Sequence, residues 1–223
     1  MNDVRPIPDW LRWARQIQAI AQTGLTYVKD PFDQQRYEAL RALAAEIVAR
    51  IAGRGEPSAR ADELAGLFVH GAGYATPKLD VRGAVFREEA DGESAILLVK
   101  ERSDGGWTLP GGWVDVGESP SYAVEKEVRE ESGLEVKARK VVALLDRDRQ
   151  GHPLYTHHVW KVFLACDVVG GRMHEAGDGI EIDEVGFFRQ SQIPPLSLPR
   201  VLPSQIERLF AHHRRPDLPT DFD

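Results

Sequence analysis

Three things are scarce in this sequence: cysteine, long apolar runs and net positive charge. Cys166 is the single cysteine among 223 residues, so no internal disulfide can form, which fits a reducing cytoplasm. No apolar run approaches the ~20 residues that cross a bilayer. The first residues have neither the basic start nor the apolar stretch of a secretory signal. We therefore expect a cytoplasmic protein with no membrane partner.

The charge balance excludes a second class of partner. The formal net charge is −7 at pH 7, so the chain has no general electrostatic attraction to DNA, RNA or an anionic membrane. We expect no stable nucleic-acid partner. If the protein acts on phosphates, something must offset the repulsion between its carboxylates and the substrate. Bound metal ions are the usual means.

The first part of the chain, to about residue 70, has the periodicity of helices. The predicted helices are 10–22, 30–53 and 61–69. The first is expected to stop at Gly24, and the second to begin with Asp30 as N-cap followed by Pro31. So few helices have a thin core, and we expect them to pack on the rest of the chain or on a second subunit.

From Lys78 onward the apolar residues alternate as they do in strands. The predicted strands are 80–86, 95–100, 136–146, 156–168 and 182–188, and the predicted helices are 120–132 and 204–213. This order indicates an α/β fold with a mixed sheet covered by helices. The expected division is a helical N-terminal domain at 1–70, an α/β domain at 71–213 and a mobile Pro- and Asp-rich tail at 214–223.

A cluster of glutamates stands out in the predicted helix 120–132. Glu127, Glu130 and Glu131 are spaced i, i+3 and i+4, which puts three carboxylates on one helix face. Like charges this close repel one another, and a hard divalent cation with oxygen ligands removes the repulsion. An isolated pattern of this kind is more often a solvated acidic face with basic neighbours.

The glycines around the cluster favour a site over a solvated face. Pro110-Gly111-Gly112 permits a tight loop and a close backbone approach to phosphate oxygens. Gly117-Glu118 follows, and Gly133 ends the helix. The whole segment resembles the Nudix box, G-x5-E-x7-R-E-U-x-E-E-x-G-U, in which U is aliphatic. It matches at every fixed position except one, because Lys126 stands where the family usually has arginine.

This resemblance implies a Nudix α/β/α sandwich and metal-dependent hydrolysis of a nucleoside diphosphate linked to a group X. The residues that match the family's metal-binding and catalytic carboxylates are Glu127, Glu130 and Glu131. The resemblance also implies the carbonyl of Gly112 as a ligand of Mg²⁺ or Mn²⁺. Glu118, Lys126 and Gly133 would support the box. A lysine keeps the charge of the family's arginine but loses its forked contact, which leaves the orientation of Glu127 open.

Three further residues are candidates outside the box. In some Nudix enzymes the general base lies on a late loop, and Glu181 and Glu184 are the candidates here. For each of them, a solvated loop charge is the alternative. Arg82 is a charge among apolar neighbours in the strand 80–86. It would contact a substrate phosphate or form an ion pair at the edge of the strand.

A second resemblance spans most of residues 8–210. Segments 10–27, 33–38, 184–188 and 193–197 look like a Nudix subgroup that includes CDP-choline pyrophosphatases and proteins labelled ADP-ribose pyrophosphatases. It implies a homodimer built by the N-terminal helices, and it favours hydrolysis of CDP-choline to CMP and phosphocholine. ADP-ribose hydrolysis and trimming of RNA from its 3′ end are the alternatives. A non-catalytic nucleotide sensor and a dimerisation module are the other classes considered.

Overall fold

The computed structural model describes residues 7–52, 73–174 and 181–223, with the side chains of 51 and 52 left out. The chain forms two compact units. The helical unit comprises Met1–Lys78 with Leu154–His158, and the sheet unit comprises Leu79–Pro153 with Val159–Asp223. The observed division therefore falls at Lys78, not at residue 70. The predicted helix 61–69 lies outside the described residues.

Within its described residues, the helical unit contains two packed helices, α1 (Asp9–Tyr27) and α2 (Pro31–Ala52). Asp30 caps α2 as predicted, since its carboxylate accepts the backbone N–H groups of Phe32 and Asp33 at 2.9 and 3.0 Å. The predicted stop at Gly24 is wrong, because α1 continues to Tyr27. A Cβ at Gly24 would lie 2.4 Å from the ring of Tyr37. The glycine therefore serves the close packing of α2 on α1 and does not end a helix.

The described strands of the sheet unit form one seven-stranded mixed sheet in the order β3-β2-β1-β5-β4-β7, with β6 also paired to β2. The strands are β1 (Lys78–Glu88), β2 (Ser94–Glu101), β3 (Trp107–Thr108), β4 (Leu134–Asp146), β5 (Val159–Gly171), β6 (Ile182–Arg189) and β7 (Asp221–Phe222). Two 3₁₀ turns, Arg147–Arg149 and Gln190–Gln192, follow β4 and β6. Because β4 pairs antiparallel with β5 but parallel with β7, the sheet is mixed, as predicted.

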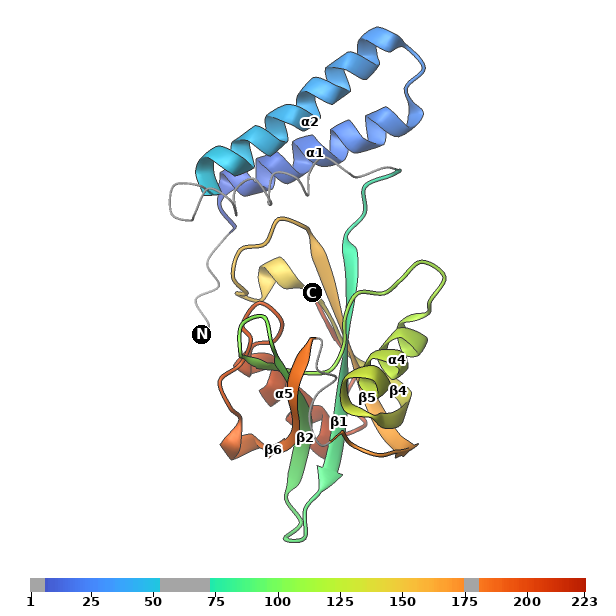
Figure 1. Cartoon of the computed structure of the whole chain (residues 1–223), viewed down its shortest axis with the longest axis vertical. Helices are drawn as coiled ribbons and strands as arrows, with labels where there is room; N and C mark the ends of the chain where they lie inside the picture. The colour runs from blue at the N-terminus through green and yellow to red at the C-terminus, as the bar shows by residue number, and fades with distance from the viewer. Residues whose placement is uncertain (1–6, 53–72, 175–180) are drawn as a thin grey trace. The chain divides into compact units, whose positions relative to one another are not determined.

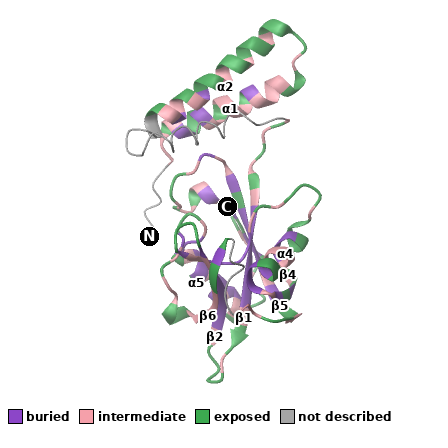
Figure 2. Ribbon diagram, in the orientation of Figure 1, coloured by how far each residue is buried: buried purple, intermediate pink, exposed green. Residues whose placement is uncertain are grey.

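Two helices cover opposite faces of this sheet: α4 (Pro120–Ser132) and α5 (Pro203–Arg214) (Figure 1). Neighbouring strand residues fall into different clusters, as Leu97 and Leu98 do, because side chains alternate across a strand. The α4 layer includes Val81, Val85, Leu97, Ala123, Val124, Val128, Val162 and Leu164. The α5 layer includes Ala84, Ile96, Leu98, Phe163, Ile206, Leu209 and Phe210. These buried residues are concentrated in the strands (Figure 2), and the predicted α/β/α sandwich is confirmed.

The C-terminal segment is folded, which corrects the predicted mobile tail at 214–223. Asp221–Phe222 forms β7, which pairs with Ala143 and Leu144 of β4. The side chain of Asp223 accepts hydrogen bonds from Asp146 N–H and from Gln150. The prolines of this segment indicate irregular structure. They do not indicate that its last residues pair with the edge of β4. Among the described ranges, no helix is both long enough and apolar enough to span a membrane.

Candidate active site

The loop 109–112 lies against β1 through backbone hydrogen bonds. Val81 N–H donates to the carbonyl of Gly112 at 2.9 Å, and Gly83 N–H donates to the carbonyl of Pro110 at 2.8 Å. Gly111 has φ 143°, and a Cβ there would lie 2.0 Å from the carbonyl oxygen of Val81. Only glycine allows this approach of loop and strand.

Helix α4 begins and ends at the residues that the sequence marks. The hydroxyl of Ser119 accepts the backbone N–H of Tyr122 at 3.2 Å, and Pro120 occupies the first turn. Gly133 ends the helix in the left-handed region with φ 78°. The apolar face of α4 is buried on the sheet. Glu127 and Glu131 lie beside the loop 109–112, and Glu130 is exposed.

The three box carboxylates differ in exposure. Glu131 is buried, and its Oε2 accepts the backbone N–H of Gly111 at 2.9 Å. Burial raises the pKa of Glu131 to about 8. Burial also raises the pKa of Glu127, against the opposing charge of Lys126, while Glu130 is exposed.

This set of groups fits a divalent metal ion. Three carboxylates on one helix face supply the oxygen ligands that hard cations prefer. Burial is the main cause of the raised pKa of Glu127 and Glu131, and a nearby positive charge favours the ionised form of such groups. A metal ion would supply that charge.

Gly112 lies beside one of these carboxylates. A Cβ at Gly112 would lie 3.2 Å from the carboxylate of Glu127, so the loop and the helix are in close contact. The carbonyl of Gly112 already accepts the N–H of Val81, which leaves one lone pair for another partner. Its part as a metal ligand stays a prediction.

Lys126 is directed to the earlier glutamate of the box. Its ammonium donates to Glu118 Oε1 at 2.9 Å and lies 3.6 Å from Asp115 Oδ2. The hydrogen bond to Glu118 is the main cause that raises the pKa of Lys126 to about 12, and the charges of Glu118, Glu127 and Asp115 add to it. The lysine thus connects α4 with the loop that precedes it. The supporting role of Glu118 stays a prediction.

Arg82 forms the ion pair that was the alternative to a phosphate contact. Its guanidinium is bidentate on Asp80, with Nη2–Oδ1 2.7 Å and Nε–Oδ2 3.2 Å, and its Nη1 donates to the carbonyl of Leu109 at 3.1 Å. Lys161 donates to the same carboxylate from β5. Asp80 and Lys161 were not predicted from the sequence, although both are charged residues within apolar strands, as Arg82 is.

The two candidate bases have different surroundings. Glu181 is exposed, directly precedes β6, and is close enough to Glu127 for its charge to raise the pKa of that group. Glu184 lies within β6 and pairs with Lys100 at 2.6 Å. Glu101 is a further carboxylate that was not predicted from the sequence. It is buried, pairs with Arg200 at 2.7 Å, and contributes to the raised pKa of Glu131.

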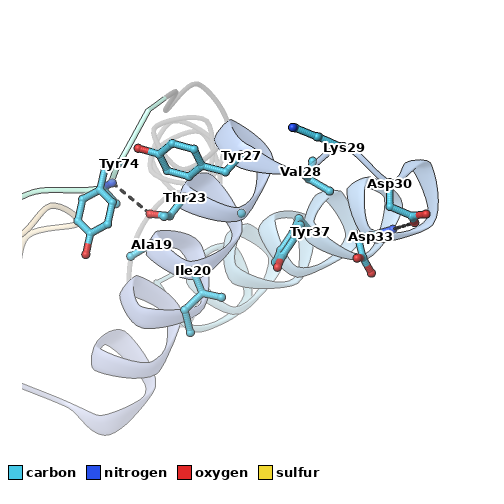
Figure 3. A pocket seen from close by; sticks show the side chains of 12 residues that line it. Ala19, Ile20, Thr23, Tyr27, Val28, Lys29, Asp30, Asp33, Tyr37 and Tyr74 are labelled. Atoms are coloured by element: carbon cyan, nitrogen blue, oxygen red, sulfur yellow. Dashed lines mark hydrogen bonds between the residues drawn. The ribbon is translucent and has the colours of Figure 1, made fainter.

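A hollow of about 800 Å³ lies on the helical unit, between the end of α1 and the start of α2 (Figure 3). Its lining includes Tyr27, Tyr37 and Tyr74. Tyr27 and Tyr74 are 66% and 67% exposed, so they are not core residues. Asp30 and Asp33 at its rim are engaged, the first in capping α2 and the second in an ion pair with Arg36. The hollow therefore presents aromatic side chains, and both carboxylates in its lining are engaged in other contacts.

Comparisons with known proteins agree with this geometry. Residues 77–209 match the model of the NUDIX domain, and residues 8–60 match a model described as the UDP-X-like N-terminal oligomerisation domain. The putative ADP-ribose pyrophosphatase YjhB of Bacillus subtilis is 42% identical over 96% of this chain and 97% of its own length.

Two solved structures extend the likeness to the fold. A crystal structure of an ADP-ribose pyrophosphatase from Streptococcus suis has a TM-score of 0.58 and 41% identity, covering 66% of this chain and all of that one. A crystal structure of a UDP-X diphosphatase has a TM-score of 0.58 and 32% identity, covering 96% of this chain and 98% of that one. With the box carboxylates in place on α4, the chain belongs to the Nudix hydrolase family.

Proposed function

We propose that this Nudix pyrophosphohydrolase cleaves ADP-ribose, with CDP-choline as the second candidate substrate. Nudix hydrolases depend on divalent metal ions, and the observation that carries the reaction is the presence of Glu127, Glu130 and Glu131 on one face of α4. The resemblance of the sequence to its Nudix subgroup favoured CDP-choline. Two relatives at 41% and 42% identity are named for ADP-ribose, and the one at 42% covers 96% of this chain. These relatives move ADP-ribose to first place among the candidate substrates.

The chain's own residues divide the work of hydrolysis. Glu127, Glu130 and Glu131 would hold the ions, here Mg²⁺ or Mn²⁺, with the carbonyl of Gly112 as a further ligand. When bound, the ions neutralise the diphosphate and lower the pKa of a water molecule. A water oxygen bonds to one phosphorus, the anhydride P–O bond breaks, and the proton of the water passes to a carboxylate. The products are AMP and ribose 5-phosphate.

We favour Glu181 over Glu184 as the carboxylate that accepts this proton. The charge of Glu181 acts on Glu127, whereas Glu184 is held by Lys100 at the sheet surface. A general base must come within hydrogen-bond reach of the reacting water. Arg82 stays a candidate for contact with a substrate phosphate, because two of its N–H groups have no described acceptor.

CDP-choline remains a candidate because of the tyrosines of the helical unit. Quaternary ammonium groups bind against aromatic faces, and Tyr27 and Tyr74 present theirs to solvent (Figure 3). If choline binds to the helical unit, Tyr27→Ala and Tyr74→Ala will weaken the binding of CDP-choline and leave the binding of ADP-ribose unchanged. Equal effects on both substrates would remove this support for CDP-choline.

We also propose that the helical unit forms a homodimer. Trp13 and Ile20 are seven residues apart on α1, and both are more than half exposed. Such a stripe is the seam along which two helices pack. Ile20→Glu is expected to shift the protein from dimer to monomer in size-exclusion chromatography with light scattering. A dimer that survives Ile20→Glu and Trp13→Glu together would contradict this interface.

Turnover assays distinguish a pyrophosphohydrolase from a nucleotide sensor, a dimerisation module and an exonuclease. Phosphate release would be followed with a coupled phosphatase for ADP-ribose, CDP-choline, NADH, sugar nucleotides and dinucleoside polyphosphates, with Mg²⁺ or Mn²⁺. A compound that is hydrolysed only in the presence of the metal ion identifies the group X of the substrate. Thermal stabilisation by Mn²⁺ and nucleotide without turnover would indicate a sensor, and no stabilisation would indicate a dimerisation module. Release of nucleotides from the 3′ end of RNA alone would make the protein an exonuclease.

A further inference from the structure

The side chain of Arg82 is fixed at three points. Two of its nitrogens donate to the two oxygens of Asp80, and the third donates to the carbonyl of Leu109 at 3.1 Å. The side chain is only 7% exposed. Leu109 begins the loop 109–112, so the guanidinium connects β1 with the loop whose Gly111 N–H binds Glu131.

Lys161 adds one more contact to this chain of interactions. Its ammonium donates to Asp80 Oδ2, the oxygen that also accepts Arg82 Nε. Lys161 lies on β5, the neighbour of β1 in the sheet, and its side chain is 3% exposed. In the described part of the chain, Asp80 is its one hydrogen-bond acceptor.

Stability alone does not account for this lysine. Asp80 and Arg82 would already form a neutral, bidentate pair, which is the strong geometry for a buried carboxylate. A second buried cation carries a desolvation penalty that a single shared carboxylate offsets poorly. What the lysine adds is a constraint on Asp80, because a carboxylate held from both sides cannot rotate.

We propose that Lys161 and Asp80 are positioning residues for the metal-binding carboxylate Glu131. Lys161 fixes Asp80, Asp80 orients Arg82, and Arg82 holds the loop that presents the Gly111 N–H to Glu131 Oε2. The strength of metal binding at α4 is therefore set in part by a residue on β5. This inference rests on the proposed function in one respect, that Glu131 binds the metal ion.

The test measures Mn²⁺ binding to the full-length protein without nucleotide, by calorimetry and electron paramagnetic resonance. Lys161→Met removes the ammonium and leaves the Asp80–Arg82 pair neutral, so the fold is kept. Loss of a residue that orients a metal ligand weakens metal binding by about 10–100-fold, and we expect Lys161→Met to fall in that range. Lys161→Arg restores a cation and is expected to recover most of the affinity. Lys140→Met is the matched control, since Lys140 also lies on a strand but donates to the carbonyls of Pro216 and Leu218.

Several outcomes would overturn the positioning role. Unchanged Mn²⁺ affinity with a raised KM for the nucleotide would make Lys161 a substrate contact. Unchanged Mn²⁺ affinity with a lowered Tm would make it a structural residue. Failure of the proposed function is seen separately, as absence of turnover by the wild-type protein, because the Mn²⁺ measurement needs no substrate. A wild-type protein that binds no Mn²⁺ overturns the positioning role together with its premise.

Discussion

Lys126 donates a hydrogen bond to Glu118 at 2.9 Å, and both side chains are more than four-fifths buried. The other carboxylate oxygen of Glu118 has no partner among the described residues. The lysine that replaces the family's arginine therefore joins α4 to the loop before it. Its main partner is Glu118 and not the adjacent Glu127.

Removing the ammonium of Lys126 is expected to weaken this connection. Lys126→Met leaves Glu118 buried without its cation, so the Tm falls and kcat drops by roughly tenfold, as for other residues that support a metal site. Lys126→Arg keeps the charge and is expected to retain most of the activity. Thermal unfolding and steady-state kinetics on the two variants measure the difference. Equal kcat for Lys126→Met and the wild-type protein would show that the contact is dispensable.

The two candidate bases are separated by paired substitutions. Glu181→Gln is expected to lower kcat by about 10²–10⁴-fold with little effect on KM, because loss of a general base acts on the chemical step. Glu184→Gln loses only the ion pair with Lys100 at the sheet surface, and its kcat is expected to stay near that of the wild-type protein. The opposite ranking of the two variants would assign the base to Glu184.

The approach of the glycine loop to β1 gives a prediction about the backbone. Gly111→Ala would place a Cβ 2.0 Å from the Val81 carbonyl oxygen, so the loop must move and Glu131 loses its N–H donor. We expect loss of turnover and destabilisation of at least about 1–3 kcal/mol in urea unfolding. Gly117→Ala is the control, since Gly117 also has a positive φ, 94°, but no atom within 4 Å of its Cβ position. Similar turnover in the two variants would contradict the account of this loop.

His152 gives the protein a pH-dependent stability. Its Nδ1 pairs with the carbonyl of Leu198 at 2.7 Å, and the side-chain amide of Gln205 donates to Nε2 at 3.0 Å. The amide orientation is fixed, because Gln205 Oε1 accepts the N–H of Leu202. Both ring nitrogens are thus matched to a neutral imidazole, and burial lowers the pKa of His152 to about 3.

The sign of this effect follows from linkage. Below the unfolded pKa of 6.5, the unfolded chain binds a proton that the folded chain does not. Stability is therefore complete above pH 6.5 and falls as the pH is lowered toward 3, by at most about 1.4 kcal/mol per pH unit for this one group. Urea unfolding at pH 7.5, 6 and 5 is expected to show a steeper loss in the wild-type protein than in His152→Asn. Parallel pH profiles would contradict the assignment.

Local sequence signals predict the elements of the site well. The helix 120–132 has its predicted ends, because Ser119, Pro120 and Gly133 each act on the backbone next to them. The strands alternate between two buried faces, and this alternation is visible in the sequence. The box spacing likewise places three glutamates on one helix face without reference to the rest of the chain.

Features that depend on contacts between distant segments were not predicted. Lys161 and Asp80 are 81 positions apart, and their pairing follows from the adjacency of β1 and β5. Gly24 has the residue type of a helix end, but the ring of Tyr37 on another helix determines its role. The C-terminal residues cover the edge of β4, which no local pattern indicates. These are tertiary effects that override local preference.

The most direct test of the central claim is Mn²⁺-dependent hydrolysis of ADP-ribose by the wild-type protein and by Glu131→Gln. Glutamine keeps an acceptor for the Gly111 N–H, so the variant is expected to fold with an unchanged Tm. Loss of a metal ligand removes several kcal/mol of transition-state stabilisation, which corresponds to about a thousandfold in kcat/KM. The control Glu207→Gln alters an exposed carboxylate on α5 and is expected to match the wild-type protein. Turnover by Glu131→Gln equal to that of the wild-type protein would contradict the claim that the carboxylates of α4 form the metal site.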